Sequence, residues 1–289
     1  MDNISTIFLA ISLIIIMLGM GLSLVIDDFK RIFVHPKAIL VGLTNQILIL
    51  PLVGFGLASI FPTQPEIAIG IMILAACPGG PTSNLISHLA KGDIALSVTL
   101  TAISSFVTIL TIPFIINFAL LHFLEQGQVI ALDIIQTIIK ILVITVIPVG
   151  IGMLIRKYKE NFALKMAKPV RRASGILLII IIIAIIFKEK ENIVSYFRQA
   201  GVIALCLNAV TMIIGYYSAK LFRITDQRAI SIAIESGIQN GTLAITIAIV
   251  LLQNTSFAVA PAVYSIIMFF TGGIVVYLGI KKHNAQNKN

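Results

Sequence analysis

The chain has 289 residues, of which 58% are hydrophobic and only 11% are charged. Soluble globular domains carry about 25% charged residues, so this chain has too few charges to cover a surface that faces water. The formal charge of +9 does not indicate a nucleic-acid partner, because the basic residues lie between apolar segments. Cys77 and Cys206 both lie in apolar stretches and predict neither a disulfide framework nor a thiolate metal site. The composition predicts a protein embedded in a lipid bilayer.

Nine apolar segments have about the length that spans a bilayer. The predicted spans run near 4–26, 38–60, 67–89, 95–121, 132–155, 168–187, 200–221, 229–252 and 258–280. The first segment follows Asp2 without a basic region and is too long for a cleaved leader, so we expect it to stay as a span. The longest connection, 156–169, is predicted to be a short basic loop that sets orientation, with contact to anionic lipid headgroups as the alternative. The fold class is therefore all-α polytopic membrane protein, with residues 1–289 as a single membrane domain.

The basic residues orient these spans. Seventeen of the 21 Lys and Arg residues fall on one side of the predicted membrane. Three, all in 188–198, fall on the other side, and Lys140 lies within the fifth span. Cytoplasmic loops carry the excess of Lys and Arg. We therefore predict a multi-pass protein of the cell inner (plasma) membrane, with its N-terminus outside and its C-terminus in the cytoplasm.

Two of the spans are interrupted by residues that disfavour a continuous apolar helix. The third contains Cys-Pro-Gly-Gly-Pro-Thr-Ser-Asn at 77–84, and the eighth contains Glu-Ser-Gly-Ile-Gln-Asn-Gly-Thr at 235–242. A kinked packing helix would explain one such break, but the second stands at the matching position of a later set of four spans. We predict an inverted repeat, 1–121 and 166–289, joined by a linking span, 122–165, with two crossing discontinuous helices.

Glu235 is the only one of the 12 acidic residues that lies deep within a predicted span. Burying an acid there costs at least about 2.5–3.5 kcal/mol, so it needs a partner. Lys140 lies near the end of its span and is expected to reach the interface instead. Oxygen-bearing groups that a hard cation accepts occur within spans two, three, four and eight: Gln46, Ser83, Asn84, Ser97, Thr101 and Gln239, with the unwound backbone carbonyls of Ser236 and Ile238. One carboxylate without clustered His or Cys favours sodium over zinc or copper.

The half-helices also expose N-termini at membrane depth. Backbone donors there carry partial positive charge and suit an anion. The segment 79–83 and Gly241 are therefore predicted to face a substrate carboxylate. A bound anion would also offset the excess positive charge of two sodium ions beside one carboxylate.

Three motifs together resemble the bile acid:sodium symporter family over nearly the whole chain. They are Cys-Pro-Gly-Gly-x-x-Ser-Asn at 77–84, Gly-Asp-x-x-Leu-Ser-x-x-x-Thr at 92–101 and Glu-Ser-Gly-x-Gln-Asn at 235–240. The resemblance implies a core domain around two crossing discontinuous helices and a separate panel domain. It also implies two sodium sites, one formed by Ser83, Asn84, Ser97, Thr101 and Glu235 and the other by Gln46, Glu235, Ser236, Ile238 and Gln239. The substrate is then expected beside the crossing, near Thr82 and Asn240, with Gly80, Pro81 and Gly241 lining the same site.

The chain departs from the family pattern in two places. Bacterial members commonly have ten spans, whereas nine are predicted here, which bears on the completeness of the panel domain. Pro81 stands where members often carry Thr, so one hydroxyl contact to the substrate is expected to be missing.

These features predict a sodium-coupled symporter, not an enzyme, that imports a small organic anion by alternating access. The anion would be bile-acid-like, or a keto or hydroxy acid such as pantoate, and no obligatory protein partner is expected. Alternatives are proton coupling through Glu235, arsenite-type efflux through Cys77, and a passive channel. An aspartyl protease needs two embedded acids, and a Ser83–His88 pair is disfavoured because His88 lies at the end of its span.

Overall fold

The computed structural model describes residues 3–124, 133–191 and 193–286, and helices make up nearly all of this part of the chain. Asp2, on which the leader prediction depends, and Lys288, one of the seventeen basic residues on the predicted cytoplasmic side, lie outside the described residues. In chain order the elements are α1 Asn3–Ser23, α2 Ile26–Lys30, η1 Arg31–Phe33, α3 Pro36–Thr44, η2 Asn45–Ile49, α4 Leu50–Ile60, α5 Pro65–Ala76, α6 Pro81–Leu89, α7 Ile94–Phe123, α8 Ile134–Tyr158, α9 Glu160–Lys188, α10 Ile193–Leu221, α11 Asp226–Gly237, α12 Gly241–Thr246, η3 Ile247–Leu251, η4 Ser256–Ala258 and α13 Val259–Gln286.

Six helices among the described residues are long and apolar enough to cross a membrane, which identifies a multi-pass membrane protein. The six are Pro36–Ile60, Ile94–Phe123, Ile134–Tyr158, Glu160–Lys188, Ile193–Leu221 and Ser256–Lys282. A seventh is obtained if α1 and the bent segment after it count as one span. The third and eighth predicted spans are not single helices long enough to cross a membrane, because each is divided into two short helices.

The first span bends by 77° where α1 gives way to the segment Ile26–Phe33. The backbone N–H of Val25 donates to the Asp28 carboxylate at 2.8 Å, and Arg31 pairs with the same carboxylate at 2.6 Å. An acid in the first turn satisfies the free N–H groups of a new helix, so it stabilises a fresh start at this point. The straight span predicted for 4–26 therefore ends early, at Ser23.

The basic loop predicted for 156–169 is wrong, because this segment is helical. α8 continues to Tyr158 and α9 begins at Glu160, so Lys159 alone joins them. Arg156 and Glu160 form an ion pair at 3.2 Å, four residues apart. Lys, Arg, Glu, Ala and Met all have good helix propensity, so the charge of this segment did not argue against a helix.

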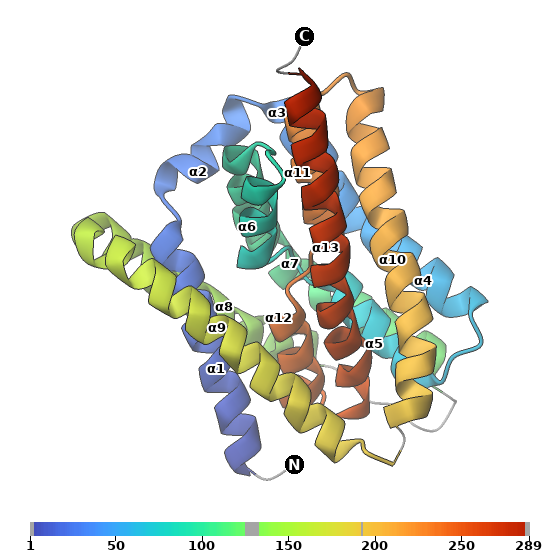
Figure 1. The fold of residues 1–289 in the computed structure, drawn as a ribbon. Coiled ribbons are helices and arrows are strands. Elements are labelled where there is room, and N and C mark those ends of the chain that lie inside the picture. Colours follow the sequence, from blue (N-terminus) through green and yellow to red (C-terminus); the bar gives the residue numbers. More distant parts are fainter. Residues whose placement is uncertain (1–2, 125–132, 192, 287–289) are drawn as a thin grey trace.

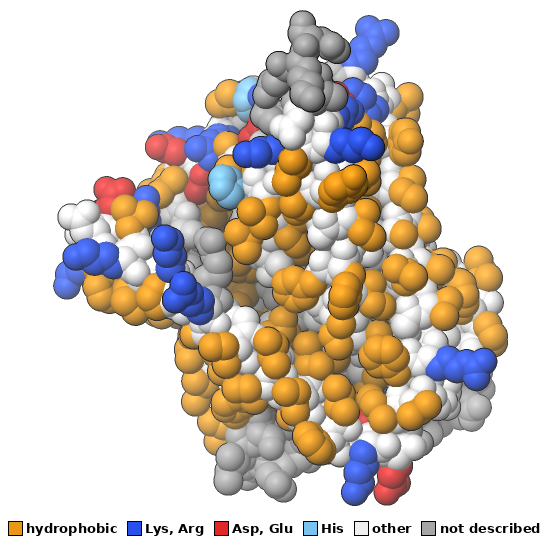
Figure 2. All heavy atoms as spheres, in the orientation of Figure 1, with side chains coloured by type: hydrophobic (Ala, Val, Ile, Leu, Met, Phe, Trp, Pro, Cys, Tyr) orange, Lys and Arg blue, Asp and Glu red, His pale blue; other side chains and the backbone are white. Residues whose placement is uncertain are grey.

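The helices form two adjoining groups (Figure 1). α1 packs against α8 and α9, while α10 packs against α11 and α13, and α5 against α4 and α7. The deepest part of the second group is α5, in which every residue from Ile67 to Ala76 is buried. Hydrophobic side chains cover most of the visible face of the molecule, and charged side chains gather at its upper and lower ends and at the corner on the left (Figure 2). This distribution matches a body that is surrounded by lipid.

Candidate ion and substrate site

The two helix breaks lie against each other in the interior. The backbone N–H of Asn240 donates to the carbonyl of Pro78 at 2.9 Å, and Gly79 and Gln239 form an isolated antiparallel bridge. Each break therefore satisfies backbone groups of the other, as irregular backbone at membrane depth requires. Both breaks are shorter than the motifs suggested. They cover 77–80 and 238–240, and the neighbouring polar residues remain helical.

The Glu235 side chain lies at this crossing and is only 1% exposed. Its carboxylate accepts hydrogen bonds from the hydroxyl groups of Thr101 at 2.6 Å, Ser83 at 2.7 Å and Ser97 at 3.4 Å. The Asn84 side-chain oxygen accepts from Ser97 at 2.9 Å and from Thr101 at 3.2 Å. The five residues predicted for the first sodium site are thus in mutual contact, although they come from α6, α7 and α11.

Local structure explains how these side chains meet. Ser97 and Thr101 are four residues apart on α7 and share one face of that helix. α6 begins at Pro81, so Ser83 and Asn84 lie in its first turn and point to the crossing. A Cβ at position 79 would overlap the Glu235 carboxylate, so only glycine allows the break to approach the acid this closely.

The Glu235 carboxylate has no Lys or Arg nitrogen within 4.0 Å among the described residues. Lys140 is exposed, in agreement with a side chain that reaches the interface. The described part of the chain also contains no cluster of three or more His, Cys, Asp or Glu side chains. One carboxylate among neutral oxygens is a donor set for a hard monovalent cation and not for zinc or copper.

A second polar cluster adjoins the first. The Gln46 amide donates to the side-chain oxygen of Gln239 at 2.8 Å and to the carbonyl of Cys77 at 2.9 Å. The Gln239 amide donates to the carbonyls of Ser236 at 2.9 Å and Glu235 at 3.2 Å. Gln46 lies in the π-helical segment η2, a geometry often found at functional sites.

Of the second predicted set, four residues are therefore linked by direct hydrogen bonds. The fifth, Ile238, lies in the break itself and is fully buried. The interpretation of Ser236 as unwound backbone was wrong, because α11 continues through Gly237. The Ser236 carbonyl is nevertheless accessible to a side chain, since the last carbonyls of a helix have no partner within it.

Two residues that were not predicted from the sequence hold the end of α11. The Gly237 carbonyl accepts from the Asn208 amide and from the Tyr264 hydroxyl, each at 2.7 Å, and the same amide lies 3.2 Å from that hydroxyl. Asn208 and Tyr264 are both 0% exposed. A signal was present, because Asn208 is the only Asn or Gln in the seventh predicted span.

A cavity of 480 Å³ adjoins the crossing on the side where α6 and α12 begin. Its walls come from α1, α6, α7, α9, α12 and α13, and all five residues predicted to contact substrate line it: Gly80, Pro81, Thr82, Asn240 and Gly241. Among the described side chains that line this cavity there is no Lys, Arg, Asp or Glu, and His88 is the only titratable one. An anion bound there would be met by neutral donors and helix N-termini.

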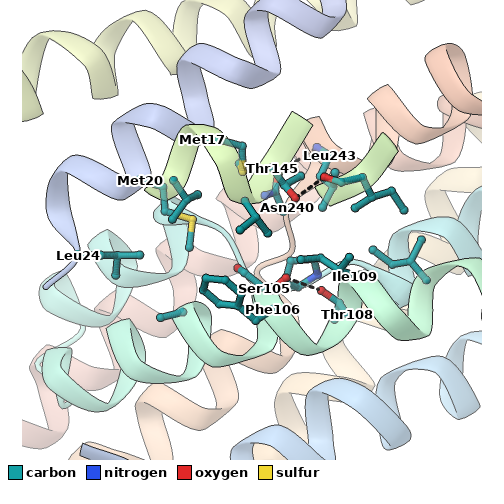
Figure 3. A pocket seen from close by; sticks show the side chains of 16 residues that line it. Met17, Met20, Leu24, Ser105, Phe106, Thr108, Ile109, Thr145, Asn240 and Leu243 are labelled. Atoms are coloured by element: carbon teal, nitrogen blue, oxygen red, sulfur yellow. Dashed lines mark hydrogen bonds between the residues drawn. The ribbon is translucent and has the colours of Figure 1, made fainter. Parts of the chain in front are cut away.

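Asn240 caps α12 and still offers a donor. Its side-chain oxygen accepts from the backbone N–H of Leu243 at 3.0 Å, and no described residue accepts from its Nδ2. A narrow cavity of 20 Å³, with room for about one water, adjoins the larger one at Asn240 and Met20. Figure 3 shows Asn240 and Leu243 there, opposite Met17 and Met20, with Ser105, Thr108 and Thr145 nearby.

Comparison with known proteins places this geometry among transporters. Residues 10–196 match the model of the Sodium Bile acid symporter family. The chain is 30% identical to the uncharacterized sodium-dependent transporter YocS of Bacillus subtilis over 95% of this chain and 84% of that protein. It is 29% identical to the ileal sodium/bile acid cotransporter of Homo sapiens over 97% of this chain and 81% of that protein. It is 27% identical to the probable chloroplastic sodium/metabolite cotransporter BASS1 of Arabidopsis thaliana over 96% of this chain and 67% of that protein.

Proposed function

Because the chain belongs to the sodium bile acid symporter family, we propose that it imports a small organic anion together with sodium ions by alternating access. The family consists of membrane transporters and not of enzymes, and sodium is its co-transported ion. The observation that carries the proposal is the buried Glu235 carboxylate, whose hydrogen-bonding side chains among the described residues are the neutral hydroxyl groups of Ser83, Ser97 and Thr101. A carboxylate at this depth is stabilised when a cation neutralises it.

Two sodium ions are proposed at the crossing. The first is held by the carboxylate of Glu235 with Ser83, Asn84, Ser97 and Thr101. The second is held by Gln46, Gln239 and the carbonyls of Glu235, Ser236 and Ile238. Both sets include Glu235 or its backbone, so binding at one site orders a residue of the other. This sharing supports cooperative sodium binding.

The substrate is proposed to bind in the 480 Å³ cavity beside these ions. Thr82 and the amide of Asn240 supply donors without charge, and the walls from α1, α9 and α13 supply apolar contact. Two sodium ions and one carboxylate leave an excess positive charge, which an anionic substrate offsets at short range. Substrate and sodium therefore favour each other's binding, which is the physical basis of coupled transport.

Alternating access requires two arrangements of the helix groups. We propose nine spans, in which α5 with α6 and α11 with α12 each count as one broken span. Spans within 1–121 and 166–289 form an inverted repeat around 122–165, with the N-terminus outside the plasma membrane. The group of α1, α8 and α9 acts as the panel, and the crossing helices belong to the core that moves against it.

Sodium-gradient uptake tests the proposal. Proteoliposomes that contain the purified chain are given an inward sodium gradient without a pH gradient, and the accumulation of labelled bile acids, keto acids and hydroxy acids is measured. We expect saturable accumulation of at least one of these anions above its external concentration. Uptake that ignores sodium but follows a pH gradient would support proton coupling through Glu235, and uptake that only equilibrates would indicate a channel.

Substitution of Cys77 distinguishes organic-anion import from arsenite-type efflux. The Cys77 side chain is fully buried in α5's C-terminal cap, and its backbone carbonyl, not its thiol, contacts Gln46. We therefore expect Cys77→Ala to retain sodium-driven uptake within a factor of about two, since only a small buried side chain changes. Complete loss of transport in a variant that still folds would favour thiol-based efflux.

A further inference from the structure

Several Lys and Arg side chains without a carboxylate partner are concentrated where α8 meets α9. The segment 156–172 contains seven Lys and Arg residues and a single acid, Glu160, which pairs with Arg156 at 3.2 Å. Among the described residues no carboxylate lies within 4.0 Å of the remaining cations whose side chains are described, Lys157, Lys159, Lys165, Lys168 and Arg172. In Figure 2 the blue side chains at the left of the molecule lie over this corner.

An apolar groove of 370 Å³ opens at the same corner. It is lined by Leu154, Ile155, Tyr158, Lys159 and Phe162, so one cation stands at the edge of an otherwise apolar and aromatic surface. Tyr158 is 74% exposed and Phe162 is 51% exposed. Tyrosine at the level of lipid headgroups, beside an ammonium group, is typical of a membrane–water interface.

The distribution of residues along α9 indicates which end lies at the headgroups. Its uninterrupted apolar run occupies 175–187, the C-terminal half of the 29-residue helix, whereas all its Lys and Arg residues except Lys188 lie in the N-terminal half. Because Lys and Arg are costly in the hydrocarbon, we expect the N-terminal turns to lie at the lipid phosphates.

α9 presents different residues on two sides. Lys165, Lys168 and Arg172 follow at intervals of three and four, so they share one face of the helix. Ala167 and Val170, three residues apart, lie on another face and line the substrate cavity. Whatever holds the cationic face also fixes the position of a cavity wall.

We propose that the α8–α9 corner binds an anionic phospholipid. An acyl chain occupies the groove formed by Leu154, Ile155, Tyr158 and Phe162, and the headgroup phosphate is held by Lys159 and the cationic face of α9. Charge complementarity selects an anionic over a zwitterionic lipid, because the cations along α9 carry the charge opposite to the phosphate and the one acid of the segment, Glu160, is paired with Arg156. The bound lipid holds α9 as a wall of the substrate cavity.

Fluorescence quenching by brominated lipids tests this site directly, because the chain contains no tryptophan. The full-length Phe162→Trp variant is placed in vesicles of phosphatidylcholine that contain brominated phosphatidylglycerol or, in parallel, brominated phosphatidylcholine. We expect the apparent binding constant of the glycerol lipid to exceed that of the choline lipid by about fivefold or more, since one cation near an anionic surface contributes roughly that factor. Replacement of all four proposed phosphate contacts, Lys159, Lys165, Lys168 and Arg172, by Gln should bring the ratio close to one while quenching by brominated phosphatidylcholine persists.

The matched control is Phe270→Trp, which places the probe at an aromatic position on α13 that is 73% exposed and has no Lys or Arg within four residues. At this position the ratio of the two apparent lipid binding constants should be near one, whether or not the cations of α9 are replaced. Equal ratios at the two positions, or a preference for the glycerol lipid at Phe162→Trp that survives replacement of all four cations, would overturn the proposal. If soluble glycerol phosphate abolished the preference for brominated phosphatidylglycerol, the proposal would also be overturned, because the site would then bind an anion and not a lipid.

Discussion

The hydroxyl groups around Glu235 can satisfy its carboxylate without an ion and can also bind a cation. Its carboxylate accepts hydroxyl hydrogen bonds from Ser83, Ser97 and Thr101. Each hydroxyl has one donor and two acceptor positions, so the same oxygen can donate to the carboxylate or turn a lone pair toward a cation. The hydrogen-bonded arrangement keeps the acid satisfied at a site that one small ion would reorganise by rotation of hydroxyl groups alone.

Removal of the Glu235 charge is expected to abolish stabilisation by sodium. In Glu235→Gln the carboxylate that binds the first proposed ion and balances the charge of both ions is lost, while the side-chain volume is kept. A ligand at 100 times its Kd stabilises a protein by about 2.7 kcal/mol. We therefore expect a clear rise in Tm with sodium for the unmodified chain and none for the variant, with potassium at equal ionic strength as the reference.

Asp226→Ala is the matched acid control. Asp226 begins the same helix but lies at its outer end, where Lys220 at 2.9 Å and Lys282 at 3.0 Å contact it. Hydrogen bonds from Lys220 and then Lys282 lower the pKa of Asp226 to about 2. We expect this variant to have a lower Tm in both sodium and potassium. The rise in Tm from potassium to sodium should be the same as in the unmodified chain. A sodium-dependent rise in Tm that persists in Glu235→Gln would contradict the assignment of the sodium sites.

At the scale of elements, the two broken helices depend on each other. α5 with α6 and α11 with α12 exchange hydrogen bonds at Pro78–Asn240 and Gly79–Gln239 instead of completing their own ladders. Asn208 and Tyr264, from α10 and α13, hold the C-terminal end of α11 through the Gly237 carbonyl. Hydrogen bonds between the two broken helices, and from α10 and α13, therefore hold the crossing. They satisfy polar backbone groups that would otherwise be unpaired in an apolar interior.

A methyl group at the crossing is expected to disturb the ion sites. The Cβ of Gly79→Ala would overlap the Glu235 carboxylate, which must then move away from Ser83 and Thr101. We expect the sodium concentration for half-maximal uptake to rise at least about tenfold, which corresponds to about 1.4 kcal/mol.

The control for this change is Gly56→Ala in α4, where an added Cβ meets nothing within 4 Å. It should leave the sodium dependence unchanged and stabilise the helix slightly, because alanine has the higher helix propensity. Equal sodium dependence of the two variants would show that the approach of Gly79 to Glu235 does not matter for ion binding.

For the whole molecule, the main feature is the 480 Å³ cavity between the crossing and the wall formed by α1 and α9. Ions and substrate are assigned to different places: the ions within the core group, and the substrate between the core group and α9. A change on α9 should therefore affect substrate binding without affecting sodium binding.

Gly175→Trp tests this division. Gly175 lines the cavity, and an added Cβ meets nothing within 4 Å, so the indole has space to enter the substrate volume. We expect uptake to fall at least about tenfold while the sodium-dependent rise in Tm remains. Gly201→Trp on α10 is the control, since it also has open space but does not line the cavity. Equal losses in both variants would count against the assignment of substrate to this cavity.

The sequence by itself determined the membrane class, the two interruptions and the acid between them. Each is a local property, because apolar length, helix-breaking residues and a lone acid are visible without distant contacts. The sets of residues that meet at the crossing came from the resemblance to the family. The sequence also located most long helices to within a few residues, but not the bend after Ser23 or the helical continuation of α8 and α9 across 156–169. Both errors concern charged segments, in which a loop and a capped or salt-bridged helix have similar composition.

Only the tertiary structure decided which distant groups complete the site. Asn208 and Tyr264 reach the Gly237 carbonyl, and Gln46 reaches the Cys77 carbonyl, over separations of 27 to 31 residues. No periodicity records such pairings, because they depend on how helices pack and not on the residues of any one helix. The same reason applies to the cavity, whose walls come from six helices, and to the α8–α9 groove, which exists only because two helices meet at a single residue.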